Sequence, residues 1–191
     1  MRGLIFTTLL ILQALPAQAD WRLDNSGSQL SFVSTKATDV AEVHTFRELS
    51  GSVGTDGHAR VVIQLASVDT LIPIRDERMR ELLFQTELFP TATVDARLDI
   101  ARLQRMAVST SEVLTTEILL NMGETQLPMT AELLVTRIAP ERVLVATLKP
   151  IVVNAGAVAL ADGVEALREI AGLPSISKAV PVTFVLQFVA G

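Results

Sequence analysis

The chain has 191 residues and a formal net charge of −5; hydrophobic residues make up 49% of it and aromatic residues 4%. This length fits one all-β domain, and the apolar fraction is large enough for a core or a lined cavity. Few aromatic rings and no cluster of Lys or Arg exclude a typical nucleic-acid-binding surface. The chain has no cysteine, which excludes disulfides, thiol catalysis and cysteine metal sites.

The first 19 residues have the layout of a secretory signal peptide. Arg2 precedes an apolar run at residues 4–12, and residues 17–19 form a small-x-small cleavage signal. The apolar run is far shorter than the roughly 20 residues that a helix needs to span a bilayer. We therefore expect cleavage between Ala19 and Asp20, a mature domain at residues 20–191 and no stable membrane insertion. In a Gram-negative bacterium this export leads to the periplasm.

Alternation of apolar and polar residues predicts strands along the mature chain. The expected strands lie at residues 30–36, 43–53, 59–66, 94–100, 113–122, 127–135, 142–153 and 180–188. Residues 55–57, Thr-Asp-Gly, supply a hairpin turn before the third strand. Short connections favour antiparallel pairing, and closure into a barrel removes unpaired edges. The predicted fold class is an all-β, eight-stranded antiparallel barrel, whose small inward residues fit either a ligand cavity or a tight core.

Two short helices are predicted to interrupt the strands. The first covers residues 75–84 and carries an apolar face, so we expect it to lie across an open end of the barrel. The second begins at a capping box formed by Asp162 and Glu165 and ends before Gly172. Its apolar stripe indicates that one face packs against the rest of the domain.

Basic and acidic residues alternate on the first predicted helix. Arg75, Arg78 and Arg80 lie beside Asp76, Glu77 and Glu81, with Asp76 four residues before Arg80. A solvated, ion-paired helix face is the default interpretation. The functional alternative is that one arginine near the barrel mouth meets the polar head group of a ligand.

The two histidines give little support to catalysis or metal binding. His44 shares a strand face with Glu42, and we expect a histidine at the surface or rim of the barrel. A zinc site needs at least three ligands of suitable geometry, and no H-x-H or HExxH spacing is present. His58 follows the Asp-Gly turn and is expected to be exposed to solvent. We predict no metal site and no cofactor.

Ser67 is the one serine that invites a hydrolase reading, but it lacks the G-x-S-x-G elbow. Ser67 and Asp69 are therefore expected to hydrogen-bond local backbone where a strand ends. Asp95 and Asp99 alternate onto the polar face of one predicted strand, which leaves a carboxylate pair open. We predict no catalytic residue, so the protein is not expected to be an enzyme.

Several short motifs together resemble the YceI-like family of lipid- and polyisoprenoid-binding proteins. The matching residues, in chain order, are Trp21-Arg22-Leu23-Asp24, Ser28, Leu30, Phe32, Lys36, Phe46, Gly51, Ser67-Val68-Asp69-Thr70, Arg75-Asp76 and Phe89-Pro90-x-Ala92. The segment at residues 121–128 departs from the usual pattern of the family, as expected of a divergent subgroup. The resemblance implies an elongated, lipocalin-like barrel with helices near its opening and an apolar cavity for an isoprenoid-like amphiphile.

The leading hypothesis is an exported, non-catalytic carrier or sequestering protein for a polyprenyl lipid or a quinone. The residues expected to line its cavity are Phe32, Phe46, Ile63, Leu65, Met79, Leu83, Phe84, Val94, Leu98, Leu133 and Phe184. One alternative is an interaction module with a filled barrel that serves a membrane redox or stress-response partner. Another is an enzyme acting on lipids, for which His44 with Glu42 is the candidate pair. The sequence also leaves a homodimer open.

Overall fold

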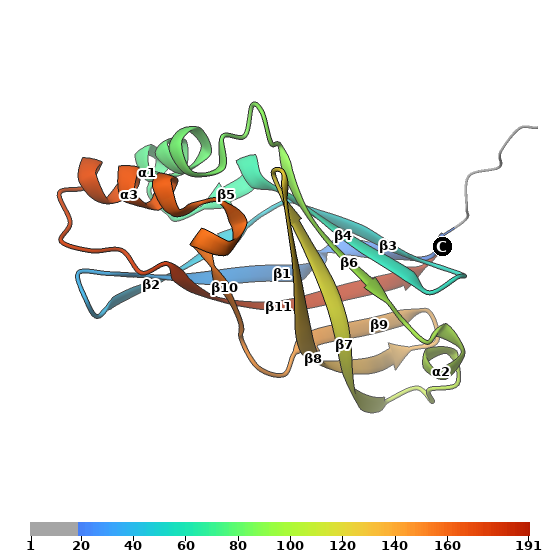
Figure 1. Ribbon diagram of the computed structural model, residues 1–191. Helices are drawn as coiled ribbons and strands as arrows, with labels where there is room; N and C mark the ends of the chain where they lie inside the picture. Colours follow the sequence, from blue (N-terminus) through green and yellow to red (C-terminus); the bar gives the residue numbers. More distant parts are fainter. Residues whose placement is uncertain (1–18) are drawn as a thin grey trace, which may run out of the picture.

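Eight antiparallel strands close into a barrel whose two ends are covered by different helices (Figure 1). The computed structural model describes residues 19–191. Pairing of the last strand with the first, from Trp21 opposite Ala190 to Phe32 opposite Val182, completes the ring. Around the barrel the order is β1 (Ala19–Lys36), β3 (Leu49–Gly54), β4 (His58–Gln64), β6 (Thr91–Arg97), β7 (Thr110–Met122), β8 (Thr125–Ala139), β9 (Arg142–Thr147) and β11 (Ala179–Ala190). The predicted eight-stranded barrel is confirmed.

Three further strands extend the sheet at one end of the barrel: β2 (Val40–Phe46) and β5 (Val68–Asp69) beside β1, and β10 (Ile151–Asn154) beside β11. Two predicted strands, 43–53 and 142–153, are therefore wrong, because each contains two strands. In the first, the buried apolar positions change from even numbers, ending at Phe46, to odd numbers, starting at Leu49. Such a change cannot occur within one strand, whose side chains alternate strictly between faces.

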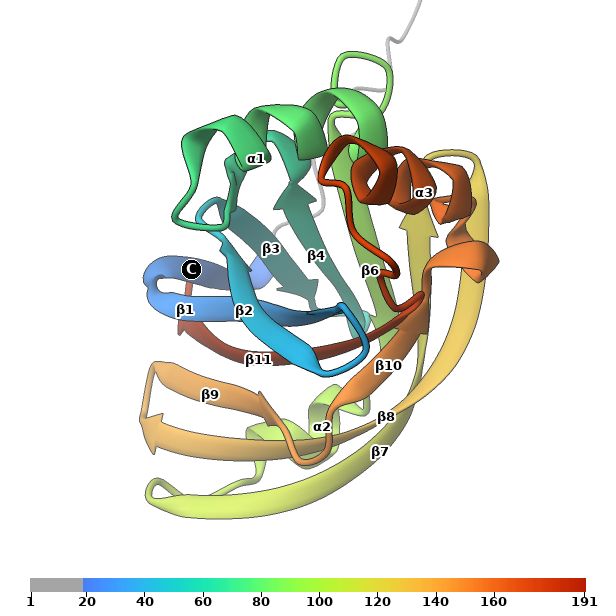
Figure 2. The ribbon, with the colours of Figure 1, turned by 90° about the vertical axis from the view of Figure 1, so that its left-hand side faces the viewer.

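A lid of helices covers this end of the barrel; it consists of α1 (Pro73–Arg78), η2 (Met79–Phe84) and α3 (Ala161–Ile170) (Figure 2). The predicted helix 75–84 is present, but it changes at Met79 from an α-helix to a π-helix. π-Helical turns are rare and are often found at functional sites. The turn buries Met79 and Phe84 and ends at Gln85, whose φ is 50°.

The third helix, α3, begins differently from the prediction. Asp162 lies inside the helix and forms no side-chain cap, so the expected capping box is wrong. Glu165 instead contacts Arg168 at 2.7 Å and Lys178 at 3.3 Å. These contacts draw the Glu165 side chain away from the helix start and tie α3 to the segment before β11. The end of the helix near Gly172, whose φ is 61°, agrees with the prediction.

A short helix that the sequence analysis missed, α2 (Ile100–Gln104), covers the opposite end of the barrel (Figure 1). Asp99 Oδ1 accepts a hydrogen bond of 3.0 Å from the backbone N–H of Arg102, which caps the helix. The predicted strand 94–100 therefore ends early, at Arg97, because Asp99 starts a helix. Two 3₁₀ turns, η1 (Leu65–Ser67) and η3 (Ala155–Val158), complete the fold and bury Leu65 and Val158.

The expected signal peptide, residues 1–19, lies outside the described residues except for Ala19, with which β1 begins. It stays a prediction. Within residues 19–191, no helix combines the length and the apolar character that crossing a membrane requires.

Candidate ligand-binding site

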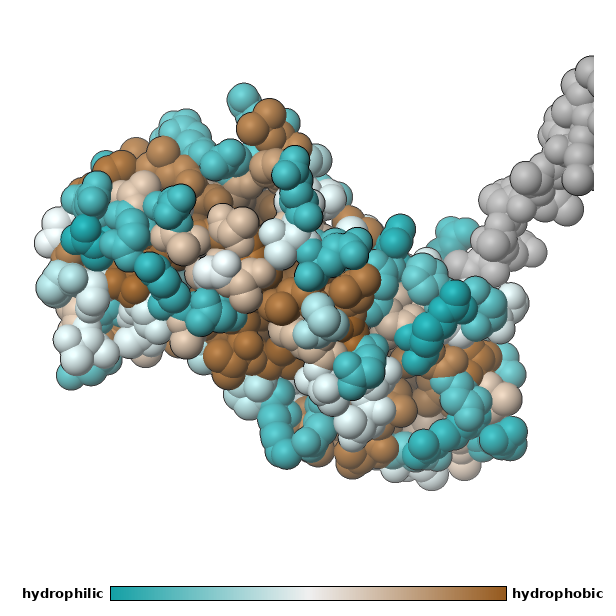
Figure 3. Space-filling view, viewed as in Figure 1, coloured by the Kyte–Doolittle hydropathy of each residue, from teal (hydrophilic) through white to brown (hydrophobic). Residues whose placement is uncertain are grey.

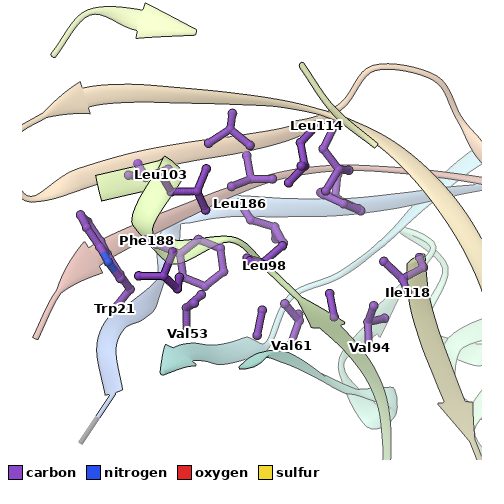
Figure 4. A pocket seen from close by; sticks show the side chains of 18 of the residues that line it. Trp21, Val53, Val61, Val94, Leu98, Leu103, Leu114, Ile118, Leu186 and Phe188 are labelled. Atoms are coloured by element: carbon purple, nitrogen blue, oxygen red, sulfur yellow. The ribbon is translucent and has the colours of Figure 1, made fainter. Parts of the chain in front are cut away.

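An apolar cavity of about 120 Å³, which we call the α2 chamber, lies inside the barrel beside α2. Figure 4 shows side chains from several strands pointing toward one another, with Leu103 of α2 among them. Of the residues that line this chamber, only Gln104 is polar. The chamber is therefore suited to a hydrocarbon group and offers almost nothing to a charged one.

A second cavity of about 160 Å³, the lid chamber, lies beneath the helical lid. Its walls come from the barrel strands and from the lid, where Leu83 and Phe84 of η2 and Val164 of α3 contribute. All of its lining residues are apolar. Of the predicted amphipathic helix, Leu83 and Phe84 thus face a cavity, whereas Met79 and Leu82 do not line it.

The two chambers adjoin at the middle of the barrel. Val94, Ile118 and Phe184 line both, so these three side chains lie at the boundary between the lid chamber and the α2 chamber. A cavity of about 150 Å³ with similar walls holds a molecule the size of benzene. Each chamber therefore has room for about one isoprene unit, and a longer tail requires the lid or the lining side chains to move.

Nine of the eleven residues expected to line a cavity do lie on chamber walls: Phe32, Phe46, Ile63, Leu83, Phe84, Val94, Leu98, Leu133 and Phe184. The other two, Leu65 and Met79, are buried in the surrounding core and line neither chamber. Leu65 belongs to η1 and so falls outside the alternation of β4 on which its placement depended. That any of these residues binds a ligand stays a prediction.

The sequence analysis missed many wall residues, which belong to three groups. Some, such as Leu30 and Leu186, share a strand face with residues that were predicted, and the same alternation would have found them. Leu103 and Met106 come with the unexpected helix α2 and the turn after it. Val158 reaches the lid chamber from η3, and no periodic pattern marks so short a turn.

A polar cluster lies beside the lid chamber; it consists of Ser34 on the inner face of β1, Glu42 and His44 on the inner face of β2, and Arg75 of α1. His44 is only 3% exposed, so the expectation of a rim or surface histidine is wrong. Its Nε2 and the Oγ of Ser34 are joined by a hydrogen bond of 2.8 Å, and its ring packs against Phe32 with 5.3 Å between centroids. Burial, followed by the charge of Arg75, lowers the pKa of His44.

Arg75 of α1 ties the lid to this cluster. It donates hydrogen bonds to Glu42 Oε2 at 2.7 Å and to the carbonyl oxygen of Thr70 at 2.8 Å. Lys36 also contacts Glu42, at 2.8 Å. The hydrogen bond from Lys36 and then that from Arg75 lower the pKa of Glu42. The default interpretation of a purely solvated helix face is therefore wrong for Arg75, which reaches across to β2.

Asp76, expected to pair with Arg80, instead accepts hydrogen bonds from Thr70, at 2.8 Å from its N–H and 2.6 Å from its hydroxyl. Thr70 is buried, so this pair fixes the start of α1 against the strand end below it. The lid is thus anchored to the barrel through both Arg75 and Asp76. Neither residue lines a chamber.

Ser67 and Asp69 have the local structural roles that the sequence predicted. Ser67 Oγ donates to the carbonyl oxygen of Gln64 at 2.6 Å and accepts from the Glu48 N–H at 3.0 Å. Asp69 accepts from the N–H of Leu71 at 3.0 Å and pairs with an arginine on the neighbouring loop. Among the described residues, no hydrogen bond joins Ser67 to a histidine, so the geometry of a serine hydrolase is not assembled in this part of the chain.

Asp95 and Asp99 do not form a carboxylate pair, because Asp99 caps α2 while Asp95 belongs to an ion-pair network between strands. Asp95 binds Arg60 at 2.7 Å, His58 at 3.1 Å and Asn121 at 3.0 Å. Burial raises the pKa of Asp95, but the hydrogen bond and charge of Arg60 outweigh this and lower it overall. His58, which was expected to be exposed to solvent, has a side chain that is 40% exposed and is paired with Asp95.

Apolar groups also reach the surface, and Figure 3 shows them gathered across the middle of one face.

Among the described residues, no group of three or more His, Asp or Glu side chains has an arrangement that could hold a metal ion. The polar cluster and the two chambers are therefore the features with the most distinctive chemistry in this part of the chain.

Comparison with known proteins places these features in a family. A family model described as a YceI-like domain matches residues 21–188. Among solved structures, a polyisoprenoid binding domain from Saccharophagus degradans, implicated in plant cell wall breakdown, is 37% identical, with a TM-score of 0.90. The match covers 91% of this chain and 100% of that chain.

Two more distant structures share the fold. BcnA from Burkholderia cenocepacia is 18% identical, with a TM-score of 0.63 over 86% of this chain and 98% of that chain. The YCEI protein from Campylobacter jejuni is 10% identical, with a TM-score of 0.55 over 97% of this chain and 91% of that chain. The search of curated proteins gave no match. Since the family model spans nearly all of residues 19–191, the chain belongs to the YceI-like family.

Proposed function

We propose that this protein is a non-catalytic carrier or sequestering protein that holds the tail of an isoprenoid-like amphiphile inside its barrel. The observation that carries the proposal is the pair of adjoining apolar chambers, whose walls share Val94, Ile118 and Phe184. The relative from Saccharophagus degradans, described as a polyisoprenoid binding domain, supports the same ligand class.

The energetics favour a branched hydrocarbon tail with few polar atoms. Burial of each CH₂-sized group contributes about 0.8 kcal/mol, so one isoprene unit contributes about 4 kcal/mol before ordering costs. Polar atoms along the tail would lose their hydrogen bonds to water without replacement by these walls. A polyprenyl lipid or a quinone with an isoprenoid tail meets both conditions.

The alternative of a filled barrel that serves as an interaction module is less well supported. It requires a packed interior, whereas the barrel contains two chambers of about 120 and 160 Å³. An enzyme acting on lipids would need polar groups at the reacting bond. His44 and Glu42 lie on one strand face but line neither chamber.

The place of action that we propose is the periplasm, on the basis of the signal-peptide pattern in the first 19 residues. Sequencing the N-terminus of protein recovered from the periplasm of an expressing Gram-negative host tests this point. An N-terminus at Asp20 is the expected result. Retention of residues 1–19 on protein in the cytoplasm would contradict it.

The function itself is tested by native mass spectrometry of the exported protein, followed by solvent extraction and identification of any bound lipid. We expect a mass shift that disappears after extraction and corresponds to a molecule with an isoprenoid tail. Reproducible absence of an apolar ligand, together with no uptake of added polyprenyl lipids or quinones, would exclude the proposal. The same spectra report whether the protein is a monomer or the homodimer that the sequence left open.

A further inference from the structure

We infer that residues 71–74, which we call the apolar loop, form a docking surface that inserts into the acyl boundary of a lipid bilayer. The apolar loop joins β5, which pairs with β2, to α1 at the outer edge of the lid (Figure 2). It lines neither chamber, so the proposed function gives it no role. The choice of a bilayer as the occupant rests partly on the proposed function, because an amphiphile with an isoprenoid tail partitions into membranes.

All four residues of the apolar loop, Leu-Ile-Pro-Ile, are apolar and exposed. Leu71 is 84% exposed, Ile74 is 52% exposed and Ile72 is 43% exposed. A single exposed apolar residue is ordinary on a protein surface, but a run of four is not. Such a run marks either a local defect or a contact surface.

Two adjacent positions of the loop carry large apolar residues where the backbone favours other types. The φ of Leu71 is 63°, a left-handed conformation that suits glycine or asparagine. Ile72 is the N-cap of α1 and forms no side-chain cap, at a position where Ser, Thr, Asp or Asn is preferred. Locally unfavourable residues concentrate at functional sites, because there the side chain serves something other than folding. The two positions therefore favour a contact surface over a defect.

Hydrogen bonds at both ends of the loop fix its backbone. Asp69 Oδ1 accepts a bond of 3.0 Å from the N–H of Leu71. The carbonyl oxygen of Ile72 accepts bonds of 2.9 and 3.0 Å from the N–H groups of Arg75 and Asp76. The apolar side chains are thus held outward in advance, and docking requires no ordering of a flexible segment.

The charges beside the apolar loop favour an uncharged occupant. Asp69 and Arg75, which flank the loop, are each engaged in an ion pair of 2.7 Å within the fold. Glu77 and Arg78 follow Ile74 by three and four residues, so the helix places one charge of each sign beside it. The loop therefore offers no excess of charge to an anionic lipid or to a charged protein surface.

The size and position of the loop fit a bilayer better than a protein. A standard protein interface uses about 20–30 residues a side, whereas the apolar loop has four. Attachment to the acyl boundary of a bilayer scales with the apolar area inserted, so a few side chains give weak, reversible binding. The loop continues into α1 and η2, and η2 contributes Leu83 and Phe84 to the lid chamber. Docking here thus brings the lid against the membrane that holds the amphiphile.

The first test measures binding of the protein that begins at Asp20 to phosphatidylcholine vesicles without any isoprenoid, by co-sedimentation. We expect weak, reversible binding that neither added phosphatidylglycerol nor added salt changes, because apolar insertion and not charge drives it. Binding that requires phosphatidylglycerol and disappears at high salt would contradict the inference, since it would show adsorption through charged groups.

Leu71→Asn removes the most exposed apolar side chain and places asparagine where the backbone suits it. Vesicle binding should weaken about tenfold, while the melting temperature should equal or exceed that of the wild type. Adding Ile74→Gln should weaken binding about a hundredfold in total. Val113→Asn is the matched control, because Val113 is an exposed apolar residue on the outer side of β7, and it should bind vesicles like the wild type.

A tryptophan in the loop tests the place of contact. Trp21 is the single tryptophan of the chain, so the wild type supplies the background fluorescence. In Leu71→Trp, vesicles of phosphatidylcholine with brominated acyl chains should quench the added fluorescence. Val113→Trp should not be quenched by the same vesicles. Equal quenching in the two variants would show that the protein does not dock through the apolar loop.

Titration with a fluorescent analogue of geranylgeraniol, which we call the probe, separates docking from ligand binding. Leu71→Asn should bind the probe in solution like the wild type but take it from vesicles about tenfold more slowly. If the wild type binds the probe but not vesicles, or if Leu71→Asn binds vesicles equally well, docking is wrong while the carrier function stands.

Two further outcomes are decisive. If Leu71→Asn converts a dimer into a monomer and leaves vesicle binding unchanged, the loop contacts a second copy of the chain and the inference is overturned. If the wild type docks on vesicles through the loop but binds no probe, the proposed function fails and the docking surface stands.

Discussion

Gly163 of α3 lies so close to Leu83 of η2 that a Cβ atom on Gly163 would come within 2.8 Å of Leu83 Cα. The same Cβ would lie 2.7 Å from the carbonyl oxygen of Leu82. Both neighbours are backbone atoms, which cannot move away as a flexible side chain can. The absence of a side chain at Gly163 therefore allows the two halves of the lid to meet above the lid chamber, whose wall includes Leu83 and Val164.

Replacing Gly163 by alanine should push α3 away from η2 and loosen the lid. We expect a loss of about 1–3 kcal/mol in the free energy of unfolding and faster exchange of bound ligand. Hydrogen exchange of the amides in η2 and α3 measures the loosening of the lid. Stopped-flow measurement of ligand dissociation tests the faster exchange of ligand. Glu169→Ala, at a solvent-exposed position of the same helix, is the control and should exchange ligand like the wild type. Unchanged amide exchange in Gly163→Ala would contradict the close packing.

The buried His44 makes stability depend on pH in mildly acidic solution. Its pKa is lowered by burial from the ordinary value of 6.5, so the unfolded chain takes up a proton at a higher pH than the folded protein does. Stability is therefore complete above about pH 6.5 and falls as the pH drops toward the pKa of the folded protein. Folding lowers the pKa of Glu42 from 4.5, so protonation of Glu42 also reduces stability, but only at a lower pH than protonation of His44 does.

Thermal denaturation between about pH 7.5 and about pH 5.5 measures this contribution. The melting temperature of the wild type should fall across this range, and that of His44→Gln should fall less, because glutamine does not titrate. An equal fall in both proteins would show that His44 is not the group responsible. The charged side chains that act on His44 come from β1, β2 and α1 and are Lys36, Glu42, Arg75 and Asp76.

The network around Asp95 should contribute to stability and not to ligand binding. Asp95→Asn removes the charge that Arg60 and His58 share but can keep the contact with Asn121. We expect a loss of about 1 kcal/mol, since Arg60 and His58 are largely solvated. Urea denaturation measures the loss, and probe titration should give an unchanged dissociation constant. A weaker affinity for the probe would show that this outer network influences the chambers.

The barrel could be predicted from the sequence because apolar and polar side chains alternate with a period of two residues along most of its strands. That period identified most of the ring and seven of the nine predicted residues on the chamber walls, including Val94 and Phe184; the other two, Leu83 and Phe84, came from the predicted helix. It failed where a strand was broken by a short turn, as after Phe46. There the parity of the buried positions was the available signal.

The polar cluster could not be predicted because it depends on distant contacts. His44 and Glu42 share a strand face, but their partners come from elsewhere in the chain: Ser34 is 10 residues from His44, and Arg75 is 33 residues from Glu42. The local sequence pattern carries no information about a contact between residues so far apart in the chain. Asp99 differs, since an aspartate just before a helix-forming stretch is an N-cap signal, and α2 could have been found from it.

The most direct test of the account places a larger side chain where the two chambers meet. Val94→Phe adds about four carbon atoms to the shared wall and should weaken binding of geranylgeraniol about a hundredfold, by displacing a similar amount of tail. Val113→Phe makes the same change on the outer, exposed side of β7, where Val113 is 52% exposed, and should bind like the wild type. Circular dichroism of both variants confirms the fold. Equal affinity of folded Val94→Phe and wild-type protein would show that the ligand does not lie in the chambers.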